Sequence, residues 1–200
     1  MRIYHVPGTR SVRPIWLCYE LGLEVDVVQI DFAQTFRDAP AWRAISPAGK
    51  VPVLTDGDLT MFESGAMVDY ILDAYGQGRL RPPAGSPARA LHQQWCWFSE
   101  ATLLRPVGLN RLLRHGSDDI ATDAAHKTRE CIAVVEGALG GGDFLLGDAF
   151  TAADVMMGYA LALLENLRVL SPADYPRACA YLDRLKAREA FQRAMGVVAR

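Results

Sequence analysis

The chain has 200 residues, half of them hydrophobic, and its 21 Lys and Arg against 23 Asp and Glu give a net charge of −2. This length can bury a sizeable core in one large or two small domains, and the near-neutral charge argues against a nucleic-acid or acidic-membrane partner. The first residues lack the long apolar stretch of a signal peptide, and no run approaches the ~18 apolar residues of a membrane span. We therefore expect a cytoplasmic protein with no membrane partner.

The four cysteines and four histidines are scattered along the chain without metal-ligand spacing, and no Cys-x-x-Cys motif is present. Neither a zinc site nor a redox dithiol is supported by this pattern. In a reducing compartment such cysteines are typically small buried hydrophobic residues. We expect no metal.

The first elements alternate between strand and helix. Residues 3–6 form a short apolar strand, and residues 12–21 have the apolar spacing of a helix that ends at Gly22. Residues 25–30 are apolar almost without interruption, which predicts a central strand covered on both faces. Residues 38–45 are predicted as a short helix that Ser46-Pro47 ends.

A hairpin follows. Residues 53–54 and 59–62 are apolar and flank the turn sequence Asp56-Gly57-Asp58. Pro52 would remove a ladder hydrogen bond at the start of the first strand, so it belongs at a strand edge or in a special turn, and we hypothesise a cis Val51-Pro52 bond. Residues 64–75 have helical apolar spacing. The resulting order is β-α-β-α-β-β-α, which differs from a Rossmann alternation.

The rest of the chain is predicted to be helical. Residues 78–87 are rich in Gly and Pro and form a linker between a domain at 1–77 and a domain at 88–200. Helices are expected at 88–113, bent at Pro106, and at 118–139, 175–185 and 188–198.

The sharpest signal in the second half precedes the segment 155–167, which is apolar nearly all round. Thr151 and Asp154 have the spacing of a capping box, and Phe150 can pack on Val155 as a hydrophobic staple. A helix that is apolar on every side is buried, so this segment is expected at the middle of a bundle.

The end of the hairpin has the elements of a binding site. The helix beginning at Ser64 presents free backbone N–H groups and a partial positive charge, which suit a carboxylate. A strand edge at Val51 lies beside it. Together these features favour a peptide with a free carboxylate.

Residues 50–54 (KVPVL) followed by Glu63-Ser64 resemble the glutathione site of cytosolic glutathione S-transferases, and the capped, buried helix is a feature of their second domain. The resemblance implies an α/β thioredoxin-like N-terminal domain, an all-α C-terminal helical bundle and a homodimer. It also implies conjugation of glutathione, as co-substrate and without another cofactor, to a small hydrophobic electrophile, as in detoxification. By match, Val51 with Pro52 would bind the cysteinyl backbone, with Lys50 beside them, and Glu63 with Ser64 would bind the γ-glutamyl carboxylate.

In a thioredoxin-like fold, the loop after the first strand, residues 7–11, would face the loop that contains Pro52, which we call the proline loop. It has no cysteine, so disulfide exchange is set aside, and it offers Thr9, Arg10 and Ser11. A hydroxyl donor near a helix terminus could hold a thiol as thiolate; lowering its pKa from about 8.5 by about two units needs roughly 2.7 kcal/mol.

Two alignments of this loop are open. Thr9 matches the serine of delta-like and fungal transferases, whereas Arg10-Ser11 matches the Cys-Ser pair of the bacterial beta class with the cysteine replaced. We predict Thr9 as the hydroxyl that activates the thiol, with Ser11 second. The alternative is that both are only turn and cap residues.

Arg105, on the long helix, is a candidate for the electrophile pocket, although such charges more often form a solvated face. The electrophile itself is not identified by the sequence. Two other functions remain open: a non-catalytic transferase-like module for protein association, and a glutathione-dependent isomerase or peroxidase. The isomerases of the zeta kind have Ser-Ser-Cys at the first helix, where this chain has Gly8-Thr9-Arg10-Ser11.

Overall fold

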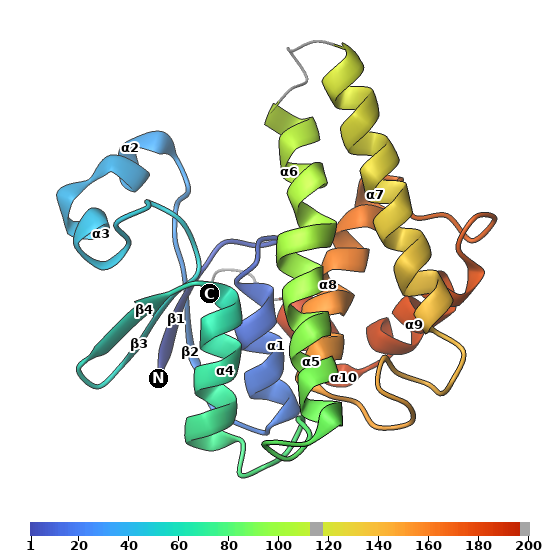
Figure 1. The fold of residues 1–200 in the computed structure, drawn as a ribbon. Helices are drawn as coiled ribbons and strands as arrows, with labels where there is room; N and C mark the ends of the chain where they lie inside the picture. The colour runs from blue at the N-terminus through green and yellow to red at the C-terminus, as the bar shows by residue number, and fades with distance from the viewer. Residues whose placement is uncertain (113–117, 197–200) are drawn as a thin grey trace. The chain divides into compact units, whose positions relative to one another are not determined.

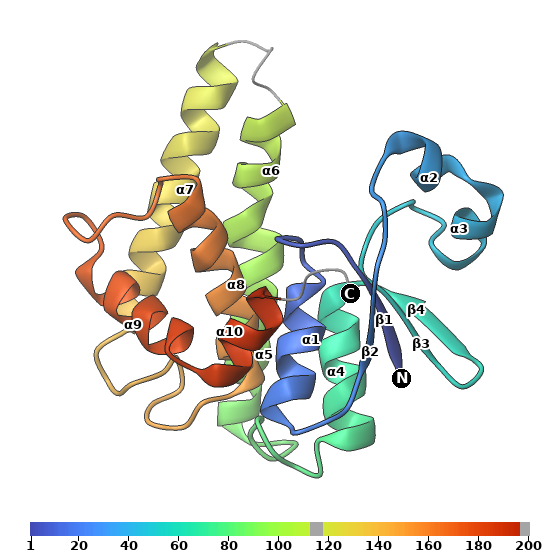
Figure 2. The ribbon, with the colours of Figure 1, turned by 180° about the vertical axis from the view of Figure 1, so that it is seen from behind.

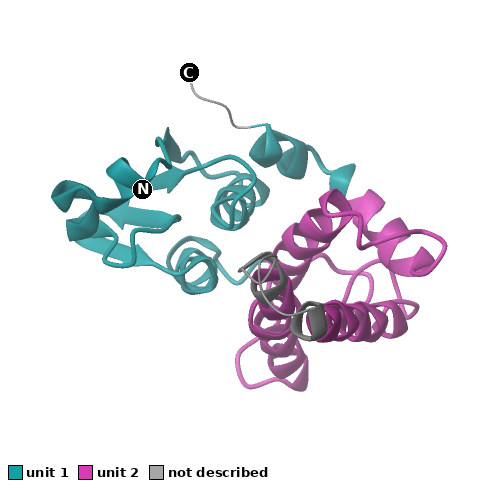
Figure 3. Cartoon of the chain, turned by 90° about the horizontal axis from the view of Figure 1, so that it is seen from above, with its two compact units in different colours: residues 1–79, 186–200 teal, residues 80–185 magenta. Residues whose placement is uncertain are grey.

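The computed structural model describes residues 1–112 and 118–196 (Figure 1). The chain forms two compact units (Figure 3): unit 1 consists of Met1–Arg79 and Lys186–Arg200, and unit 2 of Leu80–Leu185. The last helix, which the sequence places in the helical domain, thus belongs to unit 1. Among the residues described, no helix combines the length and apolar character that crossing a membrane requires.

Unit 1 is built on a four-stranded sheet. Its strands are β1 (Arg2–His5), β2 (Asp26–Gln29), β3 (Val53–Asp56) and β4 (Leu59–Phe62), in the order β2-β1-β3-β4. Strand β1 pairs parallel with β2 and antiparallel with β3, and β3 and β4 form the predicted hairpin. The parallel pair followed by a hairpin is the predicted thioredoxin-like arrangement, which is confirmed.

The prediction of a central position for β2 is wrong, because β2 lies at the edge of the sheet and pairs only with β1. Val27 and Val28 point to opposite faces and both are half-buried. The continuous apolar run therefore reports that both faces of the strand are partly covered. It does not report whether the strand has a neighbour on each side.

Helices α1 (Val12–Glu20) and α4 (Ser64–Tyr75) pack side by side on one face of the sheet (Figures 1 and 2). Residues 12–18 are all buried, and Ile71 and Leu72 of α4 are at most 1% exposed. Apolar burial of this extent holds the N-termini of both helices in fixed positions.

Two short helices, α2 (Gln34–Asp38) and α3 (Pro40–Ile45), stand where one helix over 38–45 was predicted. Pro40 disfavours the helical conformation at the preceding residue, and Ala39 accordingly has φ −60° and ψ 132°. Trp42 of α3 packs edge-on against Tyr4 of β1, with ring centroids 5.6 Å apart.

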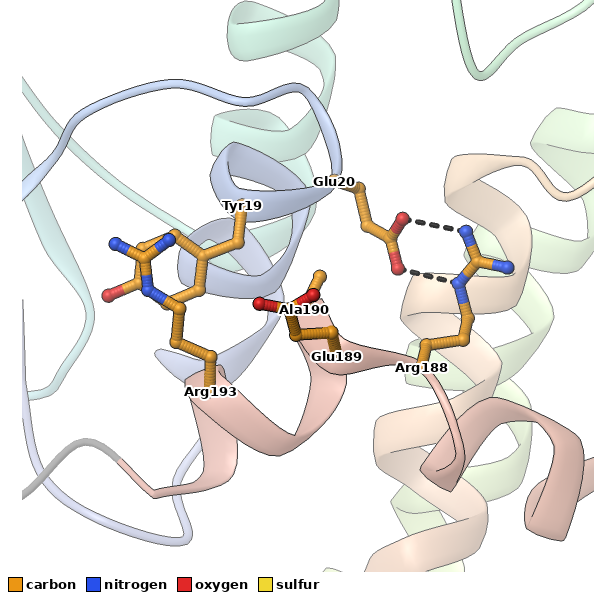
Figure 4. A pocket seen from close by; sticks show the side chains of 6 residues that line it. All are labelled: Tyr19, Glu20, Arg188, Glu189, Ala190 and Arg193. Carbon is orange, nitrogen blue, oxygen red and sulfur yellow. Dashed lines mark hydrogen bonds and ion pairs between the residues drawn. The ribbon is translucent and has the colours of Figure 1, made fainter.

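Helix α10 (Glu189–Met195) completes unit 1 by packing on α1. The rings of Trp16 and Phe191 meet edge to face with centroids 4.8 Å apart. The Glu20 carboxylate accepts two hydrogen bonds from Arg188, at 2.6 and 2.7 Å (Figure 4), and a third from the Trp16 indole at 2.8 Å. The predicted helix over 188–198 is confirmed in its described part, and its last two residues lie outside the described residues.

Unit 2 is helical. Its elements are α5 (Pro87–Trp97), the π-helix η1 (Phe98–Leu103), α6 (Leu104–Leu112), α7 (Asp118–Ala138), α8 (Ala152–Asn166) and α9 (Pro176–Lys186). The π-helix η1 lies just before Pro106, where the bend was predicted. Residue 113, the predicted end of the long helix, lies outside the described residues. Proline has no N–H for the carbonyl of Thr102, and that carbonyl accepts a long contact from the Cys131 thiol at 3.9 Å.

The predicted buried helix is confirmed, because every residue of α8 from 152 to 162 is buried. The predicted capping box is present at its start. The Asp154 carboxylate accepts hydrogen bonds from the N–H and hydroxyl of Thr151 at 2.8 and 3.1 Å, from the N–H of Leu145 at 3.0 Å and from the hydroxyl of Tyr181 at 2.7 Å. Phe150 packs on Phe144 with ring centroids 5.5 Å apart.

Candidate functional site

The proline loop of unit 1 is held by its own backbone and by one buried hydroxyl. The Val51-Pro52 bond is cis, as hypothesised, and Pro52 is buried. The Ser46 hydroxyl donates to the carbonyl of Lys50 at 2.8 Å and accepts from its N–H at 2.9 Å. The main chain that enters Val51 is therefore fixed, while the Lys50 side chain is exposed.

Two arginines support the same loop. Arg37 donates to the carbonyl of Gly49 at 3.0 Å, and Arg43 donates to the carbonyl of Pro47 at 3.0 Å. Gly49 has φ +63°, and a Cβ added there would lie 2.8 Å from the Arg43 guanidinium carbon. Only glycine fits this position without displacing the arginine.

Glu63 and Ser64 form the start of α4, as predicted. Glu63 has φ 75° and ψ 108°, a conformation that residues other than glycine rarely adopt and that is concentrated at functional sites. Ser64 is buried, and its hydroxyl accepts a hydrogen bond from Arg13 at 3.3 Å. Arg13 is itself 0% exposed, so a buried positive charge lies beside the N-terminus of α4.

The two predicted hydroxyls lie together in the loop before α1. Thr9 and Ser11 have their hydroxyl oxygens 2.7 Å apart, and the Ser11 oxygen lies 2.7 Å from Nδ1 of His5. Ser11 and His5 are buried, whereas Thr9 is half-buried. The Thr9 hydroxyl also donates to the carbonyl of Val6 at 2.8 Å. Ser11 stands at the N-cap position of α1 but makes no side-chain capping bond.

Arg10, the third predicted residue of this loop, is half-buried, and its carbonyl accepts the N–H of Arg13 at 3.2 Å. Sequence reasoning missed His5 and Arg13. A signal for both existed, because strand alternation places His5 on the same face as buried Ile3, and Arg13 lies within the apolar start of α1. Neither signal says which partner the polar group will have.

Arg105 belongs to unit 2, where it is exposed and lines a cavity of about 490 Å³ between α6 and α7 together with Thr102, Lys127 and Cys131. A second cavity, of about 380 Å³, lies between α1 and α10 in unit 1 (Figure 4). Three of the charged side chains that line it are engaged: Glu20 pairs with Arg188, and the Arg193 guanidinium lies 4.0 Å from the centre of the Tyr19 ring. No predicted site residue lines it, so we assign it a structural role.

Within the described part of the chain, no three His, Cys, Asp or Glu side chains are grouped so that they could hold a metal ion. Besides the His5 ring and the Glu63 carboxylate, the polar groups of the site are hydroxyls, backbone amides and guanidinium groups, of which that of Arg13 is buried. Such groups bind and orient an anionic peptide, and they can stabilise a thiolate.

A thioredoxin-like unit with a cis-proline loop, followed by a helical unit with a capped central helix, defines the class of protein. The profile described as "Glutathione S-transferase, N-terminal domain" matches residues 1–73, and that described as "Glutathione S-transferase, C-terminal domain" matches residues 118–184. Together the two matches span more than half of the sequence. The chain belongs to the glutathione S-transferase family.

Individual relatives cover nearly the whole chain. Glutathione S-transferase 3 of Zea mays is 29% identical over 211 residues, which is 99% of this chain and 94% of the relative. Among solved structures, BphK, a bacterial transferase in a ternary complex, is 27% identical with a TM-score of 0.86 and covers 98% of both chains. A sphingomonad glutathione S-transferase complexed with glutathione is 26% identical with a TM-score of 0.84, covering 98% of this chain and 97% of its own.

Proposed function

We propose that the protein is a glutathione transferase that adds the thiolate of glutathione to a small hydrophobic electrophile. Its family membership and its full-length likeness to a transferase complexed with glutathione support this function. The observation that carries the proposal is local to unit 1. A cis-proline loop held by Ser46 occurs in the same unit as a buried Arg13-Ser64 pair at the start of α4.

The proposed peptide lies with its cysteinyl main chain along Val51, next to Pro52. Val51 precedes β3, so its backbone takes no part in the strand pairing and is proposed to bond the peptide. Its γ-glutamyl carboxylate lies at the start of α4 with Glu63 and Ser64. Because the Ser64 hydroxyl accepts from Arg13, its own proton remains available for a carboxylate oxygen. The first N–H groups of α4 and the buried charge of Arg13 add attraction for the anion.

The thiol of the bound peptide is proposed to lie at Thr9. The thiol loses its proton to water, and the Thr9 hydroxyl donates a hydrogen bond to the resulting thiolate. The sulfur then attacks the electrophilic carbon, so that a C–S bond forms and the leaving group departs with its electron pair. Preferential bonding to the thiolate lowers the thiol pKa, which raises the fraction of nucleophile at neutral pH. Ser11 is the second candidate for the same contact.

Further proposals concern substrate, assembly and location. Arg105 would favour electrophiles that carry an acidic group. The proposed assembly is a cytoplasmic homodimer, in which a partner could cover exposed apolar side chains such as Phe62 and Trp97, which are 48% and 69% exposed. No metal, bound cofactor or nucleic acid takes part.

Retention on immobilised glutathione and titration calorimetry test the proposed function. The wild-type protein should be retained, and Ser64→Ala should raise the Kd for glutathione about 10-fold, the equivalent of about 1.4 kcal/mol for a lost hydrogen bond to a charged group. Thr60→Ala, at an exposed position of β4, is the matched control and should leave the Kd unchanged. A folded wild-type protein that does not bind glutathione contradicts the proposal.

Catalysis is tested separately from binding with an aryl chloride activated by nitro groups, by following the thioether product. Binding without conjugation would favour the non-catalytic module. Conversion of a peroxide or of a cis-enone substrate in its place would favour the peroxidase or the isomerase.

A further inference from the structure

We propose that His5 and Ser11 are positioning residues which orient the Thr9 hydroxyl so that it donates its proton to the sulfur of glutathione. This inference rests on the proposed function, in which Thr9 contacts the thiolate. It adds a buried residue, His5, that touches neither the peptide nor the electrophile. The three side chains form a row in which the oxygen of Ser11 lies 2.7 Å from both Nδ1 of His5 and the oxygen of Thr9.

The number of available protons determines which group is the donor in each hydrogen bond of the row. With the thiolate bound, three hydrogen bonds must be filled: sulfur to Thr9, Thr9 to Ser11, and Ser11 to His5. The two hydroxyls supply one proton each. The carbonyl of Val6 lies 3.3 Å from the Ser11 oxygen and is a second, longer acceptor for the Ser11 proton, but it leaves the 2.7 Å contact between Ser11 and Thr9 unfilled. If Thr9 gives its proton to the sulfur, Ser11 must give its own to Thr9, and the third proton must be the Nδ1–H of His5.

The other tautomer of His5 does not satisfy the row. With Nδ1 unprotonated, Ser11 would donate to His5, and two hydroxyl oxygens 2.7 Å apart would have no proton between them once Thr9 turned to the sulfur. A contact of that length between two acceptors is repulsive. His5 in the Nδ1–H form therefore biases Thr9 toward the donor role.

The loop backbone allows the Thr9 hydroxyl to turn toward the sulfur without leaving the carbonyl of Val6 unpaired. In this structure the Thr9 hydroxyl donates to the carbonyl of Val6 at 2.8 Å. That carbonyl also accepts the backbone N–H of Thr9 at 3.3 Å, so it keeps a partner when the hydroxyl turns away. Of the three side chains, Thr9 is half-buried and is the most accessible to a ligand, whereas Ser11 and His5 are only 0% and 1% exposed.

The test compares His5→Asn with His5→Leu. The amide nitrogen of Asn occupies the place of Nδ1 and keeps a donor for Ser11, whereas Leu removes it. The readout is the pKa of the thiol of bound glutathione, followed by thiolate absorbance near 240 nm, together with kcat and the Kd for glutathione. His5→Leu should raise the thiol pKa by about one unit. At pH values below that pKa, it should lower kcat about 10-fold. His5→Asn should stay within about twofold of the wild type, and neither should change the Kd for S-methylglutathione by more than about twofold.

Two controls separate this inference from the proposed function and from misfolding. Ser11→Ala should reproduce the effect of His5→Leu, which provides a second route if His5→Leu does not fold. His92→Leu, at another buried histidine, should leave the thiol pKa unchanged.

The outcomes are distinguishable. If the wild-type protein neither binds glutathione nor lowers its thiol pKa, the proposed function fails. If it does both, but His5→Leu and Ser11→Ala leave the thiol pKa unchanged while Thr9→Ala raises it, the positioning role is overturned. A lower thiol pKa in His5→Leu would also overturn it, because it would mean that His5 accepts a proton from the row.

Discussion

Two buried polar clusters, one in each unit, differ in how completely their hydrogen bonds are filled. In unit 2, the Asp154 carboxylate accepts four hydrogen bonds from Thr151, Leu145 and Tyr181, and all donors belong to the same unit. In unit 1, the row from His5 through Ser11 ends at a half-buried hydroxyl of Thr9. We call the Asp154 cluster closed, because its donors and acceptors bond one another and contribute to stability. We call the row in unit 1 open, because Thr9 keeps a donor for a ligand.

The electrostatics of the closed cluster agree with a structural role. Burial raises the pKa of Asp154, and the four hydrogen bonds oppose that change by favouring the carboxylate. Burial also raises the pKa of Tyr181, with the neighbouring charge of Asp154 adding to it. The tyrosine therefore stays a donor, and the carboxylate remains fully engaged.

The largest expected effect comes from opening the closed cluster. Asp154→Ala leaves buried donors on three residues without an acceptor and should lower the free energy of unfolding by about 3–5 kcal/mol. Asp123→Ala is the matched control, because it removes a carboxylate that forms an exposed i,i+4 pair with Lys127; it should cost at most about 0.5 kcal/mol. Urea denaturation measures both. A cost below about 1 kcal/mol for Asp154→Ala would show that the cluster does not support α8.

A third buried polar group, His92 of α5, is less satisfied than either cluster. It is 1% exposed, and its Nε2 has no hydrogen-bond partner among the described residues. Burial, followed by the charges of Arg89 and Arg81, lowers its pKa to about 4. Between pH 4 and about 6.5 the unfolded chain therefore binds a proton at this position that the folded chain does not.

This difference predicts a pH dependence with a definite sign. The contribution of His92 is fully present above pH 6.5 and is lost as the pH falls toward 4, by up to about 3 kcal/mol. His92→Leu should flatten the free energy of unfolding across that range relative to the wild type. Urea denaturation at half-unit steps from pH 4 to 7 measures the curves. Equal slopes for His92→Leu and the wild type would contradict a neutral, buried His92.

The open cluster should respond in activity more than in stability. Thr9→Ala is expected to lower kcat about 10- to 100-fold, the equivalent of about 1.4–2.7 kcal/mol, with less than a twofold change in the Kd for glutathione. The free energy of unfolding should fall by less than about 1 kcal/mol, since Val6 keeps the Thr9 N–H. Thr9→Ser keeps the hydroxyl and is the control. An unchanged kcat would assign the thiol contact to Ser11.

Structural features that depend on residues close together in the sequence could be predicted. The hairpin, the start of α4 at Ser64 and the capping box at Thr151 each depend on a local pattern of turn residues and apolar spacing, and all three are present. The cis bond before Pro52 could be hypothesised because proline excludes an ordinary ladder position. Of these features, the cis bond before Pro52 and the start of α4 at Ser64 belong to the candidate site.

Features carried by distant partners could not be predicted. The hydrogen bond from Arg13 to Ser64 joins residues 51 positions apart, and the Trp16-Phe191 contact draws the last helix into unit 1. Apolar content likewise predicted that β2 is covered but not that it is an edge strand. A residue's own chemistry gives its burial preference, whereas its partner is set by packing of the whole unit.

The smallest expected effect comes from removing one donor of the Asp154 cluster. There each donor bonds the carboxylate independently, which we call a parallel cluster, whereas in the serial row of unit 1 each hydrogen bond depends on the one before it. The Thr151 hydroxyl is one of four donors to Asp154, and the Thr151 N–H remains when the side chain is shortened. Thr151→Ala should therefore cost only about 1 kcal/mol of unfolding free energy, and Thr151→Ser, which keeps the hydroxyl, should cost less. In the serial row of unit 1, by contrast, loss of Ser11 interrupts every bond between His5 and Thr9. If Thr151→Ala cost as much as Asp154→Ala in urea denaturation, the donors to Asp154 would be acting as a chain, and the contrast between the two clusters would disappear.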